Sequence, residues 1–360
     1  MVKKIKIFDP CFDTKEQAAI NKVLRSHLWS LGMGTRKVFE FERKFRDYVG
    51  SKQCVAVNSG TAALHLALSL FDMKNKEVII PSLTHVSVAH AITHNGGRPV
   101  FADIELNTLN IEPESIAESI SPRTELVIPV HFAGLASNLT AIDKICRRNN
   151  IDFVEDAALA TGSSYNGKKI GSHGKLVCFS FHPVKNLAMI KGGAITLNGA
   201  RSNAFRKKLV SRRWNGTASL RSRYDVDQLG WNYYMDEFSA AIGVEQLKKI
   251  NDMTNRRREI GKRYSTEIIN EYKMPYNNEC SYNFYWFLVK NRNNFIKKMK
   301  ENHIEIGTYH PPIHMLSFYR RMIRLPNTER IARELVCIPN HPNLDELDVD
   351  KIIKLSNKFV

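Results

Sequence analysis

The 360-residue sequence has no long apolar run and no internal repeat. Its longest apolar stretches, such as residues 126–136, include a His or a Pro and are well short of the roughly 20 residues that a bilayer-spanning helix needs. The first residues are basic, but the apolar segment of a secretory signal does not follow them. We therefore expect no membrane association and a cytoplasmic location.

Cysteine is scarce, and its spacing excludes common metal and redox motifs. The six cysteines form no C-x-x-C pair and have no His companion at metal-ligand spacing. Several lie within apolar runs, as buried thiols do. We expect no metal site and six free thiols in a reducing compartment, namely Cys11, Cys54, Cys146, Cys178, Cys280 and Cys337.

Acidic residues are outnumbered, which gives a formal net charge of +17. The densest basic stretch, residues 201–213, contains six Lys or Arg and no acid. Such a field attracts phosphate, whether of a nucleic acid, a lipid or a metabolite. The sequence has no zinc finger, RNP1 motif or basic tail, and a solvated helix face explains the stretch equally well. We expect no nucleic-acid partner, although a substrate diphosphate remains possible.

The chain is long enough for two domains, and its first 200 residues alternate strand-like and helix-like segments. Near-continuous apolar strands separated by helices of about ten residues are typical of an α/β fold with a mostly parallel sheet. Ligands of such sheets bind beyond the carboxyl ends of the strands. The pattern predicts strands at 54–57, 77–82, 98–103, 125–130 and 151–156, and helices at 61–70, 87–93 and 139–149.

The second half has a different pattern. Residues 176–181 and 194–197 flank a Gly-Gly turn, as neighbouring strands would, and residues 236–251 have helical periodicity that continues into the basic segment 256–263. A strand at 282–289 and a helix at 295–302 follow. We predict a large domain over residues 1–244 and a smaller α+β domain over 245–360.

Three loops at predicted strand ends carry residues suited to chemistry. Residues 58–62 place Gly60, Thr61 and Ala62 at the start of a helix, where a hydroxyl and free N–H groups can bind phosphate, although Ser and Thr are also ordinary N-caps. Asp156 closes an apolar strand, where it caps a helix or holds a cationic ring nitrogen. Lys185 lies between two strands, and a lysine amine of lowered pKa can form a Schiff base.

Together, these loops supply a phosphate cradle, a carboxylate and an amine, with Ser180 as a further hydroxyl. Pyridoxal 5′-phosphate (PLP) requires this set for its phosphate, its pyridine nitrogen and its aldehyde. A fourth loop, at residues 229–237, carries Asn232, which is otherwise a common turn former.

The ordered motifs resemble those of the DegT/DnrJ/EryC1/StrS family of PLP-dependent sugar aminotransferases. The likeness covers nearly the whole chain and implies an aspartate-aminotransferase-like dimer of PLP fold type I. The motifs are SGTAALHLAL (59–68), PSLTH (81–85), PVHFAG (129–134), EDAA (155–158), SFHPVKNL (180–187), GGAIT (192–196), GWNYYM (230–235), IGTYHPPIH (306–314) and IPNHP (338–342).

The resemblance assigns a role to each candidate residue. Lys185 corresponds to the lysine that binds the cofactor covalently and moves protons, and Asp156 to the partner of the pyridine nitrogen. His85 stands where relatives stack an aromatic ring on the cofactor, and His314 corresponds to a histidine near the sugar. Asn232 corresponds to an asparagine that reaches the cofactor phosphate of the other subunit. The phosphate cradle would consist of Gly60, Thr61, Ala62 and Ser180.

Three positions depart from the family pattern. Leu159 replaces a common Gln or His, Lys191 replaces an acid, and Tyr234 replaces a frequent Arg. All three are expected near the substrate, so they concern its identity and leave the cofactor assignment intact. A cationic Lys191 would favour a more acidic substrate.

The resemblance implies transfer of an amino group from an amino acid, glutamate by family habit, to a keto sugar that is nucleotide-linked. Dehydratases of the family lack the lysine, so Lys185 argues against that chemistry. Two alternatives remain open: an aminotransferase for a free keto sugar acid or cyclitol, and a PLP-binding regulator without catalysis.

Overall fold

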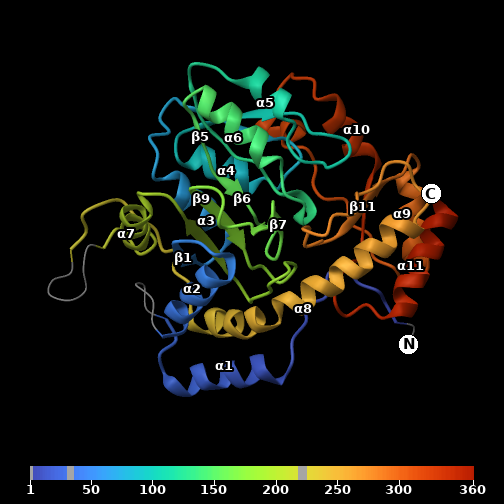
Figure 1. Cartoon of the computed structure of the whole chain (residues 1–360), viewed down its shortest axis with the longest axis horizontal. Helices are drawn as coiled ribbons and strands as arrows, with labels where there is room; N and C mark the ends of the chain where they lie inside the picture. The colour runs from blue at the N-terminus through green and yellow to red at the C-terminus, as the bar shows by residue number, and fades with distance from the viewer. Residues whose placement is uncertain (1–2, 31–35, 218–224) are drawn as a thin grey trace.

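The computed structural model describes residues 3–30, 36–217 and 225–360. Figure 1 shows a larger part built around a sheet and a smaller part at the end where both chain termini lie, with one long helix running between them. None of the described helices is both long and apolar enough to cross a membrane.

The sheet of the larger part consists of two sections. One has the order β1-β10-β9-β6 and the other β3-β2-β4-β5, and a parallel bridge between Val130 and Asp156 connects them. Only β10 runs antiparallel to its neighbours, so the predicted mostly parallel sheet is confirmed. The strands are β1 (Gln53–Val57), β2 (Glu77–Pro81), β3 (Arg98–Ala102), β4 (Thr124–Val127), β5 (Asp152–Phe153), β6 (Glu155–Asp156), β9 (Leu176–Ser180) and β10 (Gly193–Leu197).

Helices cover both faces of this sheet. Alternate residues of one strand therefore enter different cores: Val55 and Val57 pack with α3, whereas Cys54 and Ala56 pack with α2 and α8. The short strands β7 (Ser164–Tyr165) and β8 (Lys168–Lys169) form a separate hairpin. The helices are α1 (Thr14–Ser26), α2 (Arg36–Val49), α3 (Gly60–Leu68), α4 (Ser87–His94), α5 (Pro113–Ser119), α6 (Leu139–Arg148), α7 (Ser202–Arg212) and α8 (Glu237–Glu267).

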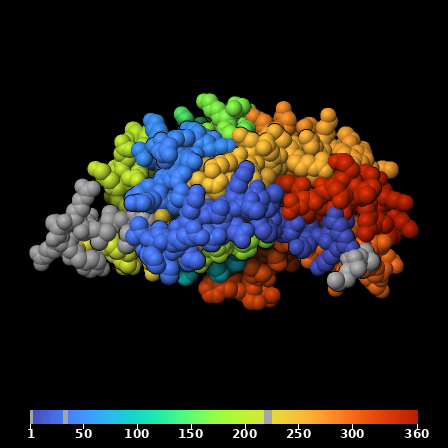
Figure 2. Space-filling model, turned by 90° about the horizontal axis from the view of Figure 1, so that it is seen from below, coloured from blue at the N-terminus to red at the C-terminus, as the bar shows by residue number. Residues whose placement is uncertain are grey.

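Helix α8 is the 31-residue helix that connects the two parts. It starts at the N-cap Asp236, whose carboxylate accepts a hydrogen bond from the Ser239 amide at 2.7 Å. Its course through the basic segment 256–263 confirms the predicted long helix. Figure 2 shows α1 and α2 beside α8 on one face, with the C-terminal helix at one end.

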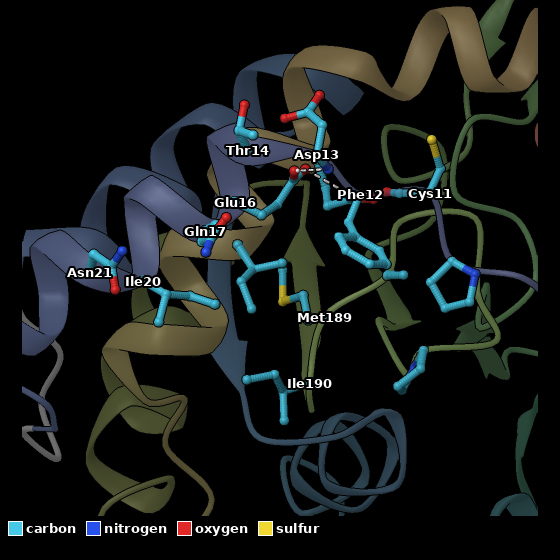
Figure 3. Close-up of a pocket in the computed structure, with 15 residues that line it drawn as sticks. Cys11, Phe12, Asp13, Thr14, Glu16, Gln17, Ile20, Asn21, Met189 and Ile190 are labelled. Carbon is cyan, nitrogen blue, oxygen red and sulfur yellow. Dashed lines mark hydrogen bonds between the residues drawn. The ribbon is translucent and has the colours of Figure 1, made fainter.

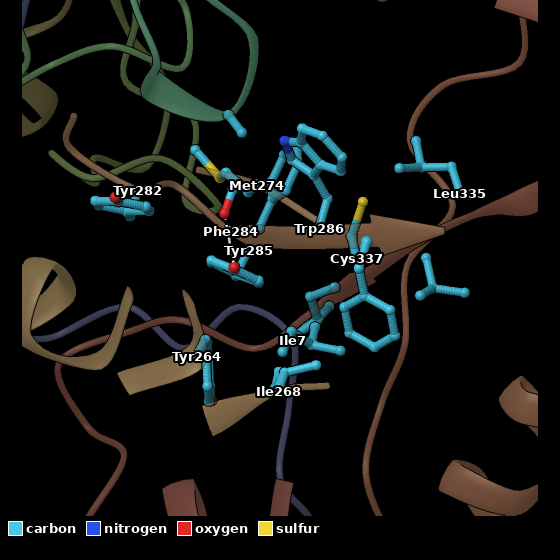
Figure 4. Close-up of a cluster of buried hydrophobic side chains, with 14 of the residues drawn as sticks. Ile7, Tyr264, Ile268, Met274, Tyr282, Phe284, Tyr285, Trp286, Leu335 and Cys337 are labelled. Atoms are coloured by element: carbon cyan, nitrogen blue, oxygen red, sulfur yellow. Dashed lines mark hydrogen bonds between the residues drawn. The ribbon is translucent and has the colours of Figure 1, made fainter. Parts of the chain in front are cut away.

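The smaller part has its own core around an antiparallel pair of strands, β11 (Tyr285–Leu288) and β12 (Leu335–Ile338). Trp286, Tyr285 and Tyr264 are buried there (Figure 4). Its described helices are α9 (Arg292–Glu301), α10 (Pro326–Glu334) and α11 (Glu346–Phe359). Before α10, the 3-10 turns η2 (Ile313–Met315) and η3 (Ser317–Tyr319) instead bury Ile313 and Tyr319 in the core around α3 and α4 of the larger part.

The start of the chain contributes to this smaller part. Ile5 pairs with Ile304 and Ile7 joins the same core, because the first residues run back along the smaller part before α1 begins. The predicted boundary at residue 244 also falls inside α8. We therefore propose to keep two domains but to assign the N-terminal segment to the smaller one.

Candidate active site

The strand register brings the predicted residues to one edge of the sheet. Ser180 at the end of β9 lies opposite Gly193 of β10, and Gly193 lies opposite Val57 at the end of β1. Asp156, at the end of β6, pairs with Cys178, two residues before Ser180. The carboxyl ends of β1, β6 and β9 therefore lie side by side, where the sheet type predicts a ligand.

The start of α3 forms a tight loop against Ser180. A Cβ added to Gly60 would lie 2.7 Å from the Ser180 Cβ, so no larger residue fits at that position. Ser59 is the N-cap and its hydroxyl accepts from the Ala62 amide at 3.1 Å. The Ala62 N–H expected in the phosphate cradle is thus used by the cap, whereas the Thr61 side chain is exposed at the helix start. A helix start of this kind favours an anion.

Asp156 is buried at the sheet edge, with 4% of its surface exposed. Burial raises the pKa of its carboxyl, while a hydrogen bond from the Ala158 amide and the fields of Lys185 and His131 lower it. Because a neighbouring cation stabilises the ionised form of a buried carboxyl, this position favours a cationic ligand group.

Lys185 lies in the loop between β9 and β10, half-buried. Burial lowers the pKa of its amine to about 8, and the nearby Asp156 opposes that shift. Within the described chain the two side chains attract each other without a direct ion pair. An amine that is partly neutral near pH 7 to 8 can act as a nucleophile and as a proton carrier.

Histidines surround the mouth of the site. His85 is exposed after β2, and its Nδ1 accepts from the Ser87 amide at 3.2 Å, which leaves Nε2 as the protonated nitrogen of the neutral ring. Burial and the positive charge of Lys185 lower the pKa of both His85 and His182. His85 therefore lies close enough to Lys185 to feel its charge, and its role against the cofactor stays a prediction.

His310 belongs to this group although the sequence analysis did not single it out. Its ring meets the His85 ring edge-on at 5.3 Å between centroids. Burial, His85 and Lys185 together lower its pKa to about 3, so the ring is neutral. His310 lies within the quoted motif 306–314, but its approach to His85 depends on how the two domains pack, which the motif alone cannot predict.

A buried pair under Asp156 was also missed. His131 and Glu155 are both fully buried, with 2.9 Å between Nε2 and Oε2. The His131 Nδ1 accepts from the Ser137 amide, so its proton is on Nε2 and points at Glu155. The His131 amide donates to the Asp156 carbonyl at 3.1 Å, which fixes the end of β6.

Asn232 lies next to the cradle loop of its own chain, with its side chain exposed. The Asn58 side-chain amide donates to the Asn232 carbonyl at 3.2 Å, and the Asn58 backbone amide donates to the Tyr233 carbonyl at 2.8 Å. These bonds hold the backbone at Asn232 and leave its amide directed to the surface.

His314 is not among the described groups that interact electrostatically with Lys185. It is buried, its Nδ1 lies 2.6 Å from the Ser82 hydroxyl, and its electrostatic partners are Glu329 and Asp103. Since Ser82 precedes His85 by three residues, His314 supports the loop that carries His85.

The basic stretch 201–213 is partly engaged in contacts within the fold. It lies on α7, where Arg212 binds the Ser69 carbonyl at the far end of α3 from Gly60. Arg213 is buried and pairs with Glu42 at 2.5 Å. At least two of the six basic residues therefore have structural roles.

The three departures from the family pattern differ in exposure. Leu159 is buried in the core of the smaller part, Lys191 is exposed, and Tyr234 is half-buried. Lys191 alone among them offers a free surface charge to a substrate.

An apolar cavity lies beside this site. It measures about 710 Å³ and is lined largely by apolar residues of α1, α8 and the segment after Lys185. Figure 3 shows Phe12, Met189 and Ile190 around it. Since Pro183 and Ala188 also line it, the cavity adjoins the lysine loop but lacks the polar groups of the site.

The residues present fit PLP. Gly60 and Ser180 form a close cradle beside a helix start, Asp156 is a buried anion for a ring nitrogen, and Lys185 is an amine of lowered pKa. His85 is positioned at the exposed side, where a flat ring could cover the cofactor.

Comparisons with known proteins agree with this fit. The family model of the DegT/DnrJ/EryC1/StrS aminotransferase family matches residues 10–356. The chain is 34% identical to the spore coat polysaccharide biosynthesis protein SpsC of Bacillus subtilis, over 98% of this chain and 96% of that protein. It is 32% identical to dTDP-4-dehydro-2,3,6-trideoxy-D-glucose 4-aminotransferase of Saccharopolyspora spinosa, over 99% and 97%.

The fold is also that of a solved relative. The sugar aminotransferase homologue Spr1654 of Streptococcus pneumoniae, in its PMP form, is 25% identical and aligns with a TM-score of 0.94 over 99% of this chain and 98% of that one. The predicted type I fold, the dependence on PLP and the aminotransferase activity are thereby confirmed.

Proposed function

Because the chain belongs to the DegT/DnrJ/EryC1/StrS aminotransferase family, we propose that it transfers an amino group from glutamate to a nucleotide-linked keto sugar. The observation that supports this best is the convergence of Lys185, Asp156 and the Gly60 cradle at one sheet edge. The Saccharopolyspora relative carries a dTDP-sugar in its name, which supports a nucleotide-linked acceptor.

The cofactor would supply an aldehyde that takes up the amino group and a cationic ring that withdraws electrons. Asp156 would keep a proton on the ring nitrogen, because a buried carboxylate is stabilised by an adjacent cation. The Gly60 and Thr61 amides, the Thr61 hydroxyl and Ser180 would bind the phosphate.

Lys185 would carry the proton between the donor's Cα and the cofactor. Its pKa of about 8 leaves a useful fraction of neutral amine at physiological pH, so Nζ can accept a proton and return it. His85 would cover the exposed ring face and reduce access of water to the reacting atoms.

We further propose that the active enzyme is a cytoplasmic homodimer. All six cysteines are free in the structure, as in a reducing compartment. The exposed Asn232 amide would contact the phosphate bound by the partner subunit.

The substrate class is tested with purified enzyme. The holoenzyme should be yellow, glutamate should shift its absorbance band, and borohydride followed by peptide mapping should place a pyridoxyl group on Lys185. A panel of nucleotide-linked keto sugars, free keto sugar acids and keto cyclitols is then screened by mass spectrometry. Amination of only the free acids or cyclitols would replace the proposed acceptor, and amination of none would support a regulator without catalysis.

The shared site is tested with mixed dimers. Lys185→Ala and Asn232→Ala subunits are each impaired as homodimers, but in a mixed dimer the subunit that keeps Lys185 receives Asn232 from its partner. An equal mixture should recover about a quarter of the wild-type activity, since half the dimers are mixed and each has one complete site. Recovery no greater than that of the parents would place Asn232 outside the partner's site.

A further inference from the structure

The lysine loop is held by a residue of the smaller domain. Asn283, immediately before β11, is fully buried. Its side-chain amide donates to the Val184 carbonyl at 3.1 Å and to Asn186 Oδ1 at 3.0 Å. One side chain therefore binds the residues on both sides of Lys185.

The segment that carries Asn283 is itself fixed against the larger domain. The Asn283 backbone amide donates to the Ala133 carbonyl at 2.9 Å, and the Ser281 hydroxyl lies 2.7 Å from the Ser163 hydroxyl. A Cβ on Gly134, which has a φ of +92°, would lie 2.6 Å from the Ser281 Oγ. The backbone at Gly134 therefore packs closely against Ser281 of this segment.

A buried cation holds the same segment from the other side. Arg257 of α8 donates to the carbonyls of Tyr282 and Asn283, each at 3.3 Å, and to that of Asn340 after β12. Arg257 thus ties the long helix to the lead-in of β11, and Asn283 ties that lead-in to the lysine loop.

Asn186 completes the connection. Its side-chain amide donates to the Ser281 carbonyl at 2.9 Å and to the Thr161 carbonyl at 3.3 Å. Asn186 and Asn283 therefore bind each other's segments reciprocally. The lysine loop is held to the smaller domain by three hydrogen bonds in the described chain, two from Asn283 and one to Ser281.

We propose that Asn283 is a positioning residue for Lys185, which couples the placement of the smaller domain to that of the reactive amine. The inference rests on the proposed function for its catalytic meaning, but the coupling itself is a property of the chain without cofactor. Movement of the β11 lead-in would shift Val184 and Asn186, and with them the lysine between them.

The test measures Lys185 directly in the cofactor-free enzyme. Acylation of Lys185 is followed across pH by mass spectrometry, and amide hydrogen exchange is measured over residues 184–187. The amine faces Asp156, His85, His182 and His310, and among the described hydrogen bonds none joins the Asn283 side chain to these four groups.

Asn283→Ala should raise hydrogen exchange of the loop about tenfold or more, because two hydrogen bonds are lost. It should also move the acylation midpoint upward from about pH 8, because a looser loop exposes the amine to water. In the holoenzyme kcat should fall more than KM rises. Asn283→Ser, which leaves a smaller hole, is the second variant if Asn283→Ala does not fold.

Asn270→Ala is the matched control. The Asn270 amide donates to the Leu288 carbonyl at 2.8 Å within the smaller domain, away from the lysine loop. It should lower thermal stability without changing acylation or exchange at Lys185. If Asn283→Ala or Asn283→Ser behaves like Asn270→Ala, Asn283 is merely structural. If the coupling is found but no keto sugar is aminated, the proposed function fails and the positioning role stands.

Discussion

Two cations in the larger domain, Lys185 and Arg213, differ in how their positive charge is balanced by nearby acids. Arg213 is fully buried and pairs with Glu42 at 2.5 Å, and the same Glu42 oxygen accepts from the Ala56 amide. Lys185 is attracted by Asp156 without a direct ion pair, and burial lowers its pKa to about 8. The first cation is neutralised in place, whereas the second is kept close to losing its proton.

The difference separates groups that stabilise the fold from groups that react. A buried pair is costly to break because the remaining charge has no partner. An incompletely paired amine costs stability but is available to a substrate, since perturbed pKa values are typical of functional sites. The comparison therefore predicts that removing each cation has effects of opposite kinds.

Loss of the reactive amine should have the largest effect. Lys185→Ala should lower kcat about 10⁴-fold or more, because both the nucleophile and the proton carrier are removed. Steady-state transamination measures the change. Lys354→Ala is the control, since that lysine is exposed on α11 near the C-terminal end of the chain. Equal losses in the two variants would mean that Lys185 has no special role.

Breaking the ion pair between Arg213 and Glu42 should have the next largest effect. Glu42→Gln should lower the free energy of unfolding by about 3–5 kcal/mol, because it breaks the buried ion pair between Glu42 and Arg213. The turnover of the folded fraction should stay near that of the wild type. Chemical denaturation and active-site titration measure the two quantities. Arg46→Ala, which breaks the exposed pair with Asp47, should cost less than about 1 kcal/mol.

Much of this arrangement could be predicted from the sequence. The loop that starts α3, Asp156 and Lys185 all follow apolar strands, and the rule that ligands bind at the carboxyl ends of parallel strands places them together. The long helix α8 was evident from its periodicity. Local pattern and topology were sufficient in these cases because each residue is positioned by its own strand.

The rest depends on contacts between segments far apart in the chain. His310 meets His85 across the domain junction. Asn283 binds the lysine loop although it lies 97 and 99 residues after its two partners in the sequence. Neither has a local signature, because an isolated His or Asn in an aromatic or Pro-rich segment is ordinarily structural. The structural role of Arg213 within the basic stretch could not be predicted for the same reason, since its partner Glu42 lies 171 residues earlier.

Asp156→Asn should lower kcat about 10²–10³-fold, which is a smaller loss than that expected for Lys185→Ala. The neutral amide cannot stabilise a proton on the ring nitrogen, but it leaves the Gly60 cradle intact, so inorganic phosphate should still compete for the site. Phosphate competition and kcat are measured on the same preparation. A variant that loses both equally would indicate local misfolding, and one that keeps full kcat would exclude the proposed role.

The smallest effect is expected for the Lys185→Met variant without cofactor. This variant should raise the free energy of unfolding, whereas Glu42→Gln should lower it. The unfolded chain keeps this lysine protonated up to its ordinary pKa of 10.5, whereas the folded chain releases the proton above about 8. Between these values the unfolded state binds more protons, so wild-type stability rises with pH. The methionine variant should therefore be more stable by roughly 3 kcal/mol at pH 7, with the gap closing by about pH 10.5.

Denaturation across this pH range measures the gap, and the Asp156→Asn background sharpens it. Without the carboxylate nothing at that position attracts the ammonium, so the cost of burying Lys185 increases and the gap should widen. A methionine variant less stable than the wild type at pH 7 would mean that Lys185 stabilises the fold as Arg213 does. The two cations would then differ only in degree, and the distinction between a stabilising and a reactive charge would not hold for this site.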